Sequence, residues 1–278
     1  MKKFQYMLAP IERITSPAFR NIAHKYGADL TFTEQIRAEG LAKNNKATWE
    51  RLELIDNTPT VIQLTGIKES NFKKFLDKFE PKKAFKGINL NLGCPSHKVI
   101  QLGLGCAMVK RVNKTQKIIE LIKDYSYEVS IKLRLGMNLF EKENKIYLNL
   151  INGTKADYYI VHARHGKQSY KSLADFSVYK ECVETGKDIV ANGDIKTKEH
   201  IDFLKDLGLK GAMIGRAAIF DPGIFNRLKG KTVPSPKEVL EEVKALTKKY
   251  DEPKRFVINL DNRNTHKPKK DRINKTYI

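Results

Sequence analysis

Cysteine is scarce in this chain of 278 residues, which contains only Cys94, Cys106 and Cys182. Three cysteines are too few, and too odd in number, for a disulfide framework, so we expect a reducing compartment. No run approaches the roughly 18 consecutive apolar residues of a membrane span, and the first residues lead into an expected strand instead of the apolar region of a signal peptide. These absences predict a soluble, cytoplasmic protein with no membrane partner.

Acidic residues are also few relative to basic ones. There are 52 Lys and Arg against 32 Asp and Glu, a formal net charge of +20. This excess of positive charge indicates a polyanionic partner, and nucleic acid is the first candidate. The alternative is a lysine-rich surface without a specific partner, of which the Lys- and Asn-rich stretch 42–47 would be an example. The length suits one large α/β domain, such as a barrel of about 250 residues, with a small appendage.

Short apolar runs alternate with longer helical patterns along most of the chain, beginning with a run at 6–10 and a helix near 17–26. This alternation is typical of parallel strands covered by helices. Eight strand–helix units favour an α/β fold with a closed (β/α)8 TIM barrel over an open doubly wound sheet. The expected strands are residues 6–10, 30–35, 60–65, 87–92, 129–135, 157–162, 188–192 and 211–214.

The barrel pattern stops after Phe225. We expect a catalytic barrel over residues 1–233 and a short, abbreviated C-terminal helical extension with a basic tail over 234–278. Ser235-Pro236 introduces one amphipathic helix. From Asp251 onward the chain is polar and basic, most strongly over 266–272. This composition predicts either a flexible tail that touches phosphates or an ordinary solvated terminus.

A thiol stands where the reactive groups of such a barrel are found, at the carboxyl ends of the strands. The fourth expected strand ends in Asn-Leu-Gly-Cys-Pro over 91–95, in which Gly93 permits close backbone approach and Pro95 stiffens the turn. An unperturbed thiol, with a pKa of about 8.5, is mainly protonated at neutral pH. Cys94 therefore suits a general acid or a nucleophile, although a lone cysteine is often only packing. The other two cysteines we expect to be packing residues.

Basic residues alternate at the ends of the next two expected strands. Lys132 and Arg134 share one side of their strand by its period of two, and so do His162 and Arg164. If they face inward, these cations need an anion, such as a phosphate, a flavin or a substrate. The alternative is a splayed, solvent-exposed strand end. The His-x-x-His spacing at 162–165 lacks a carboxylate or thiol within the motif, so we predict no metal.

The last two expected strands end in residues suited to phosphate. Asn192-Gly193-Asp194 and Gly215-Arg216 supply glycines for backbone approach and an arginine. Barrels commonly bind phosphate between these two loops.

In combination and in order, these motifs resemble those of the tRNA-dihydrouridine synthases, over roughly residues 5–225. The resemblance rests on Ala9-Pro10, Gln63, the loop at 91–95, Lys132, His162, residues 192–194 and Gly215-Arg216. It implies FMN as cofactor, NADPH or NADH as reductant and tRNA as partner. It also implies that reduced flavin delivers hydride to C6 of a uracil and that Cys94 protonates C5, giving 5,6-dihydrouridine.

By the same resemblance, Asn91, Arg134 and Arg164 would line the substrate side of the pocket. The residues implied to hold the cofactor are Pro10, Ile11, Glu12, Gln63, Lys132, His162, Asn192, Gly193, Asp194, Gly215 and Arg216. Two features depart from the family pattern. Ile11-Glu12-Arg13 replaces small apolar residues, and the C-terminal helical region is short.

Two alternatives stay open at this point. One is an FMN-dependent oxidoreductase that acts on a free pyrimidine and shares the flavin site. The other, which the short C-terminal region motivates, is a catalytically silent barrel that binds tRNA.

Overall fold

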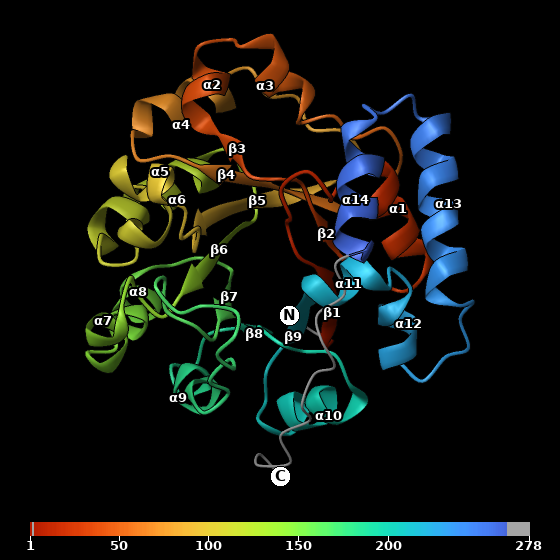
Figure 1. Ribbon diagram of the computed structural model, residues 1–278. Helices are drawn as coiled ribbons and strands as arrows, with labels where there is room; N and C mark the ends of the chain where they lie inside the picture. Colours follow the sequence, from red (N-terminus) through yellow and green to blue (C-terminus); the bar gives the residue numbers. More distant parts are fainter. Residues whose placement is uncertain (2, 266–278) are drawn as a thin grey trace.

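The structure is a computed structural model that describes residues 1 and 3–265. Its nine strands are all parallel and follow the order β1-β9-β8-β7-β6-β5-β4-β2, with β3 also beside β4 (Figure 1). A parallel bridge between Met7 and Leu30 closes the ring. The strands are β1 (Gln5–Leu8), β2 (Thr31–Phe32), β3 (Ile36–Arg37), β4 (Thr60–Thr65), β5 (Phe85–Leu92), β6 (Val129–Arg134), β7 (Tyr158–His162), β8 (Ile189–Asn192) and β9 (Gly211–Ile214).

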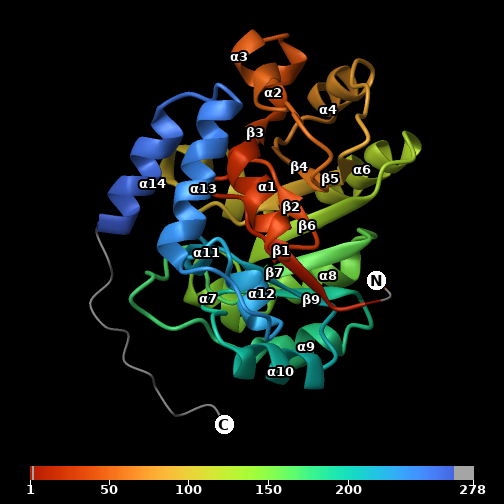
Figure 2. The ribbon, with the colours of Figure 1, turned by 90° about the vertical axis from the view of Figure 1, so that its right-hand side faces the viewer.

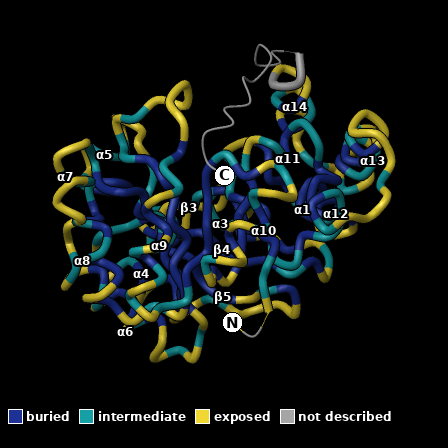
Figure 3. Tube along the Cα trace, turned by 90° about the horizontal axis from the view of Figure 1, so that it is seen from below, coloured by how far each residue is buried: buried dark blue, intermediate teal, exposed yellow. Residues whose placement is uncertain are grey.

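Helices surround the barrel. The exposed residues lie mainly on these helices and on the loops, while the strands are buried (Figure 3). The helices are α1 (Pro17–Lys25), α2 (Ala38–Ala42), α3 (Lys46–Glu50), α4 (Glu69–Leu76), α5 (His97–Gln101), the 3-10 helix η1 (Gly105–Met108), α6 (Val112–Asp124), α7 (Leu139–Glu143), α8 (Ile146–Gly153), α9 (Val178–Val183), α10 (Lys198–Asp206), α11 (Arg216–Phe220), α12 (Ile224–Leu228), α13 (Pro236–Lys249) and α14 (Arg255–Thr265).

The predicted (β/α)8 barrel is confirmed, and seven of its eight expected strands lie where the sequence placed them to within two residues. The expected strand at 30–35 was wrong, because β2 covers only Thr31–Phe32 and the short β3 follows at Ile36. The cause is Thr33, whose Oγ1 accepts from the Gln63 backbone N–H at 2.9 Å in place of a backbone carbonyl. The chain leaves the ladder there, and residues 34 and 35 turn toward the barrel mouth.

Two apolar clusters fix the position of the mouth. One fills the barrel interior with side chains that include Met7, Phe32, Val61 and Met213. The larger cluster lies between the strands and the surrounding helices. On α6 its buried positions recur at the helical period, which presses one face of that helix onto the sheet. The interior is therefore packed with apolar side chains, next to a layer of buried polar ones that leads to the mouth.

The C-terminal extension contains one helix more than the sequence indicated. The expected helix is α13, which begins at a capping box between Ser235 and Glu238. The expectation of a flexible tail from residue 251 was wrong for 255–265, which form α14. Phe256 and Leu260, four residues apart, are buried there, so two apolar side chains suffice to anchor the helix. The basic run at 266–272 lies outside the described residues.

The extension is fastened to α1 through α13, which lies beside that helix, while α14 packs against α11 and α13 (Figure 2). Glu252 Oε1 accepts from the Ala18 N–H at 2.7 Å, in the first turn of α1. At the other end of that helix, Glu242 accepts from Tyr26 Oη at 2.7 Å and from Lys25 Nζ at 2.6 Å. A catalytic barrel over 1–233 with an extension from 234 remains our proposal for the domain organisation. Among residues 1 and 3–265, no helix combines the length and apolar character needed to cross a bilayer.

Candidate active site

Cys94 stands on a loop that is fixed by the Asn91 side chain. Asn91 Oδ1 accepts from the backbone N–H groups of Gly93 and Cys94, each at 3.0 Å. Its Nδ2 donates to Gln35 Oε1 at 2.8 Å and to Gln63 Oε1 at 2.9 Å. The amide thus joins the thiol-bearing loop to the ends of two neighbouring strands. Cys94 is half-buried and keeps access to the mouth.

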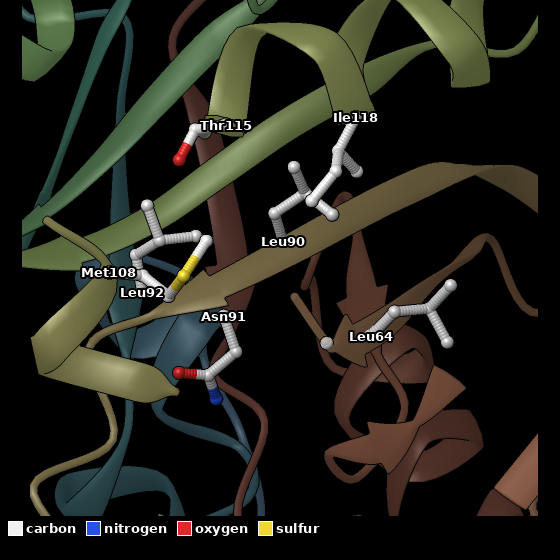
Figure 4. A pocket seen from close by; sticks show the side chains of 8 residues that line it. Leu64, Leu90, Asn91, Leu92, Met108, Thr115 and Ile118 are labelled. Carbon is white, nitrogen blue, oxygen red and sulfur yellow. The ribbon is translucent and has the colours of Figure 1, made fainter. Parts of the chain in front are cut away.

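The amide network continues below the mouth, inside the barrel. Gln63 Nε2 donates to Asn89 Oδ1, and Asn89 Nδ2 donates to Ser130 Oγ, both at 2.8 Å. These three residues are register partners on β4, β5 and β6, so they form one layer of the interior. Figure 4 shows Asn91 on the side of β5 opposite Leu90 and Leu92, which face α6 through apolar contacts.

Two residues of the following turn, Gly105 and Cys106, pack against the Cys94 loop. The Cys106 N–H donates to the Cys94 carbonyl at 3.1 Å, and Cys106 Sγ lies 3.2 Å from the Gly93 carbonyl. Burial raises the pKa of Cys106 to about 12, so this thiol stays protonated. Gly105 has a φ of +58°, and a Cβ there would lie 2.3 Å from the Cys94 carbonyl oxygen. The turn and the Cys94 loop therefore fit together only with glycine at 105.

We expect Gly105→Ala to lower the free energy of unfolding by about 1–3 kcal/mol more than Gly186→Ala, measured by urea titration. Both glycines have a positive φ, +58° and +70°, so both variants carry the same kind of backbone strain. A Cβ at Gly186 would meet nothing within 4 Å, whereas one at Gly105 would displace Cys94. Equal losses in the two variants would show that the contact with the Cys94 loop does not constrain Gly105.

A cluster of cations lies beside the Cys94 loop, on β6, which pairs with β5, and at the end of β7. Arg134, His162 and Asn192 are register partners on adjacent strands. Lys132 Nζ donates to Asn192 Oδ1 at 2.8 Å, and Asn192 in turn donates to the Met213 carbonyl. Burial, followed by the nearby Arg134 charge, lowers the pKa of Lys132 to about 7. The inward orientation expected for Lys132 and Arg134 is confirmed.

His162 is buried at the centre of this positive charge. Burial is the largest cause that lowers its pKa well below the ordinary value for histidine, so the imidazole is neutral at neutral pH. Four cations lower that pKa further: Lys132, Arg134, Arg164 and Arg216. Such a concentration of positive charge at a strand end fits an anionic ligand.

Asp194 balances part of this charge by holding two arginines. Its Oδ2 accepts from Arg164 and its Oδ1 accepts from Arg216. Arg164 is fully buried, and it also donates to the Ser172 carbonyl at 2.8 and 3.0 Å. The N–H groups of Arg164 therefore donate to protein atoms and do not point into the mouth. Arg216 is half-exposed and reaches the mouth.

Tyr170 belongs to the same cluster, although the sequence reasoning missed it. Three guanidinium carbons lie near its ring: Arg216 at 4.3 Å from the centroid, and Arg134 and Arg164 at 5.5 Å. Arg134 also donates to its hydroxyl at 3.1 Å, and the ring stacks at 6.2 Å from that of His162. The signal available in the sequence was a tyrosine within the polar loop after the sixth expected strand.

Residues 7–273 match the family model described as dihydrouridine synthase. The chain belongs to the dihydrouridine synthase family. Among similar proteins of this family, the probable tRNA-dihydrouridine synthase of Helicobacter pylori is 31% identical over 247 residues, covering 85% of this chain and 73% of that protein. The one from Rickettsia prowazekii is 27% identical over 258 residues, covering 88% and 77%.

Solved structures agree on the barrel. Morphinone reductase superposes with a TM-score of 0.57 at 12% identity, covering 84% of this chain and 88% of that one. A variant of NCR from Zymomonas mobilis gives a TM-score of 0.55 at 12% identity, covering 84% and 90%. At this identity the likeness concerns the fold alone.

The structure of this dihydrouridine synthase family member brings most predicted site residues to one mouth. Pro10 and Ile11 follow β1, and Gly193 and Gly215 follow β8 and β9. The Glu12 side chain does not join them, because its carboxylate accepts a hydrogen bond from Arg51 at 2.9 Å. Among the described residues, no three His, Cys, Asp or Glu side chains gather as a metal site would require. The absence of a metal stays a prediction.

Proposed function

We propose that this protein reduces specific uridines of tRNA to 5,6-dihydrouridine, with FMN as cofactor and NADPH or NADH as reductant. The observation that carries the proposal is the arrangement of the mouth. Cys94 is held by Asn91 at the end of β5, and the cations Lys132 and Arg134 of the adjacent strand β6 border the same mouth, together with Arg216 after β9. We place the protein in the cytoplasm because tRNA is its substrate.

The residues present fit a flavin. Apart from Asp194, which already holds two arginines, no carboxylate is hydrogen-bonded to the cation cluster in the described part of the chain. The phosphate of FMN and the reduced flavin ring both carry negative charge that such a cluster neutralises. We assign Lys132, His162 and Asn192 to the ring side and Gly193, Gly215 and Arg216 to the phosphate. The remaining residues assigned to the cofactor are Pro10, Ile11, Gln63 and Asp194.

Glu12 is assigned only through its backbone, because Arg51 engages its side chain. Arg164 acts as a positioning residue, because its buried guanidinium fixes Asp194 and the loop at 172. Asn91, Arg134 and the exposed ring of Tyr170 are the groups we assign to the substrate side, since all three border the mouth.

When bound, the reduced flavin supplies a hydride to C6 of the uracil. Cys94 donates its Sγ proton to C5, so that the two hydrogens complete the reduction, and solvent then returns a proton to the thiolate. Asn91 sets the height of the Cys94 loop through its two backbone hydrogen bonds. Arg134 and Lys132 stabilise negative charge that develops on the reacting rings.

The tRNA must present its uridine outside the base stack to reach the thiol, which requires contacts to the surrounding RNA. The net charge of +20 supplies attraction to the phosphate backbone. Contacts to phosphates position an RNA without reading its sequence, so we expect recognition mainly of tRNA shape.

An anaerobic reoxidation experiment tests the proposal. The protein is reconstituted with FMN, reduced with one equivalent of NADPH and mixed with unmodified tRNA, and flavin absorbance is followed. We expect tRNA to reoxidise the flavin, and free uracil or uridine to leave it reduced. Reoxidation by a free pyrimidine and not by tRNA would overturn the proposal in favour of a small-molecule substrate. A bound flavin that neither substrate reoxidises would indicate a silent tRNA-binding barrel.

A further inference from the structure

Exposed apolar side chains gather beside the candidate active site. Within the described residues, five large ones lie on the three loops that follow β5, β6 and β7. We call these five the apolar rim, and they are Leu102, Leu139, Phe140, Tyr170 and Leu173. Phe140 is the most exposed, with 71% of its surface accessible. An apolar cluster on a soluble surface usually marks a binding site.

The three loops, the first of which carries Cys94, form one continuous surface. The Gly166 N–H donates to the Gly136 carbonyl at 2.8 Å, which joins the second and third loops. Lys142 and Asp175 join them again, with 2.6 Å between Nζ and Oδ2. A Cβ at Gly166 would lie 3.3 Å from Cys106 Sγ, so the third loop also touches the turn that supports the thiol.

Phe140 is held in place by its backbone. Asn138 caps the short helix α7 by accepting from the Glu141 N–H at 2.9 Å. Glu141 Oε2 accepts in return from the Met137 N–H at 2.7 Å. The Phe140 ring itself belongs to neither apolar cluster of the interior. A rigid backbone therefore presents an aromatic ring to solvent, and removing the ring leaves the fold intact.

The charge around the apolar rim favours nucleic acid as its occupant. Its three loops, 93–111, 135–145 and 163–177, carry eight basic residues, Lys98, Lys110, Arg111, Lys142, Lys145, Arg164, Lys167 and Lys171, against the acidic Glu141, Glu143 and Asp175. Two of the three acids already meet lysines, Glu141 at 3.8 Å and Asp175 at 2.6 Å. Of the eight cations, Arg164 is buried against Asp194 and Lys145 pairs with Glu181 at 2.6 Å, so the ones that no described carboxylate neutralises are Lys98, Arg111, Lys167 and Lys171. An exposed aromatic ring near such cations is how proteins hold single-stranded nucleic acid.

We propose that Phe140 stacks on an unpaired base of the tRNA other than the target uridine, with Leu139 packed against the same base. This inference rests on the proposed function and deepens it. It names a contact outside the catalytic pocket that holds the RNA loop while the uridine enters. Because stacking is apolar, its contribution does not depend on the release of counterions, unlike that of the lysines.

The test compares Phe140→Ala with Phe140→Trp and with the control Ile55→Ala. Ile55 is an exposed apolar residue of the loop before β4, at the opposite end of the barrel. Affinity for unmodified tRNA is measured by fluorescence anisotropy between 50 and 300 mM KCl. We expect Phe140→Ala to weaken binding about 5- to 150-fold at every salt concentration, with the slope against log salt unchanged. Phe140→Trp should bind as wild type, with its indole fluorescence quenched by the RNA.

Two outcomes would overturn the inference while leaving the proposed function standing. The first is wild-type affinity in Phe140→Ala from a wild-type protein that does bind and reduce tRNA. The second is a wild-type protein that is dimeric by analytical ultracentrifugation and becomes monomeric with Phe140→Ala, since the rim would then hold a second copy. Failure of the wild-type protein to bind tRNA at all would instead refute the proposed function.

Discussion

Cys94→Ala is expected to reduce uridine in tRNA about 100- to 10,000-fold more slowly than wild type, the range typical of a lost general acid. Hydride transfer to C6 leaves charge that only a proton at C5 can quench. The fixed loop presents the half-buried Cys94 thiol at the mouth, and we propose that this thiol is the proton donor. Single-turnover oxidation of the reduced flavin by tRNA measures the rate.

The same variant should bind FMN and tRNA with wild-type affinity, because its backbone hydrogen bonds to Asn91 and Cys106 do not involve the side chain. Cys182→Ala is the control for loss of a thiol, since that residue is buried in α9 away from the mouth. A rate in Cys94→Ala equal to that of wild type would remove Cys94 from the reaction.

Lys132→Met is expected to weaken FMN binding about 10- to 100-fold, the usual loss for a hydrogen bond made by a charged group. The methionine keeps the length of the side chain but removes the charge that we propose faces the cofactor. Isothermal titration of FMN into the apoprotein measures the affinity. Lys155→Met, at an exposed position before β7, is the control. Unchanged affinity in Lys132→Met would contradict its place in the flavin site.

The pH dependence of stability gives Lys132 an independent signature. Its pKa of about 7 in the flavin-free protein lies below the ordinary value of 10.5, because of burial and then Arg134. Between these two values the unfolded chain binds more protons than the folded one, so the free energy of unfolding rises with pH. The rise due to Lys132 is up to about 1 kcal/mol per pH unit. It should be present in the wild-type apoprotein from pH 7 to 9 and absent in Lys132→Met.

The barrel could be predicted because its strands are short apolar runs separated by helical patterns, which report burial directly. The candidate site could be predicted for the same reason. Strand ends converge in this fold, so Arg134 and His162 had to meet once their strands were identified. The break at Thr33 could not be foreseen, since it depends on a side-chain hydroxyl that replaces one rung of the ladder.

Contacts between loops that are distant in the sequence could likewise not be predicted. Gln35 reaches Asn91, and Tyr170 meets three arginines, only because the closed barrel brings loops of different strands together. Helix α14 was missed because its composition is polar and, among its side chains that the structure describes, only Phe256 and Leu260 are buried. In each case the deciding interaction joins residues that are distant in the sequence, and local secondary-structure propensity does not indicate such a contact.

Mass spectrometry of nucleosides from tRNA tests the central claim most directly. Unmodified tRNA is incubated with the FMN-loaded protein and NADPH, digested to nucleosides and compared with a sample treated with Cys94→Ala. The account predicts a uridine heavier by two hydrogens in the wild-type sample and its near absence in the variant. A wild-type sample that contains only unmodified uridine, with flavin bound and reduced, would contradict the account.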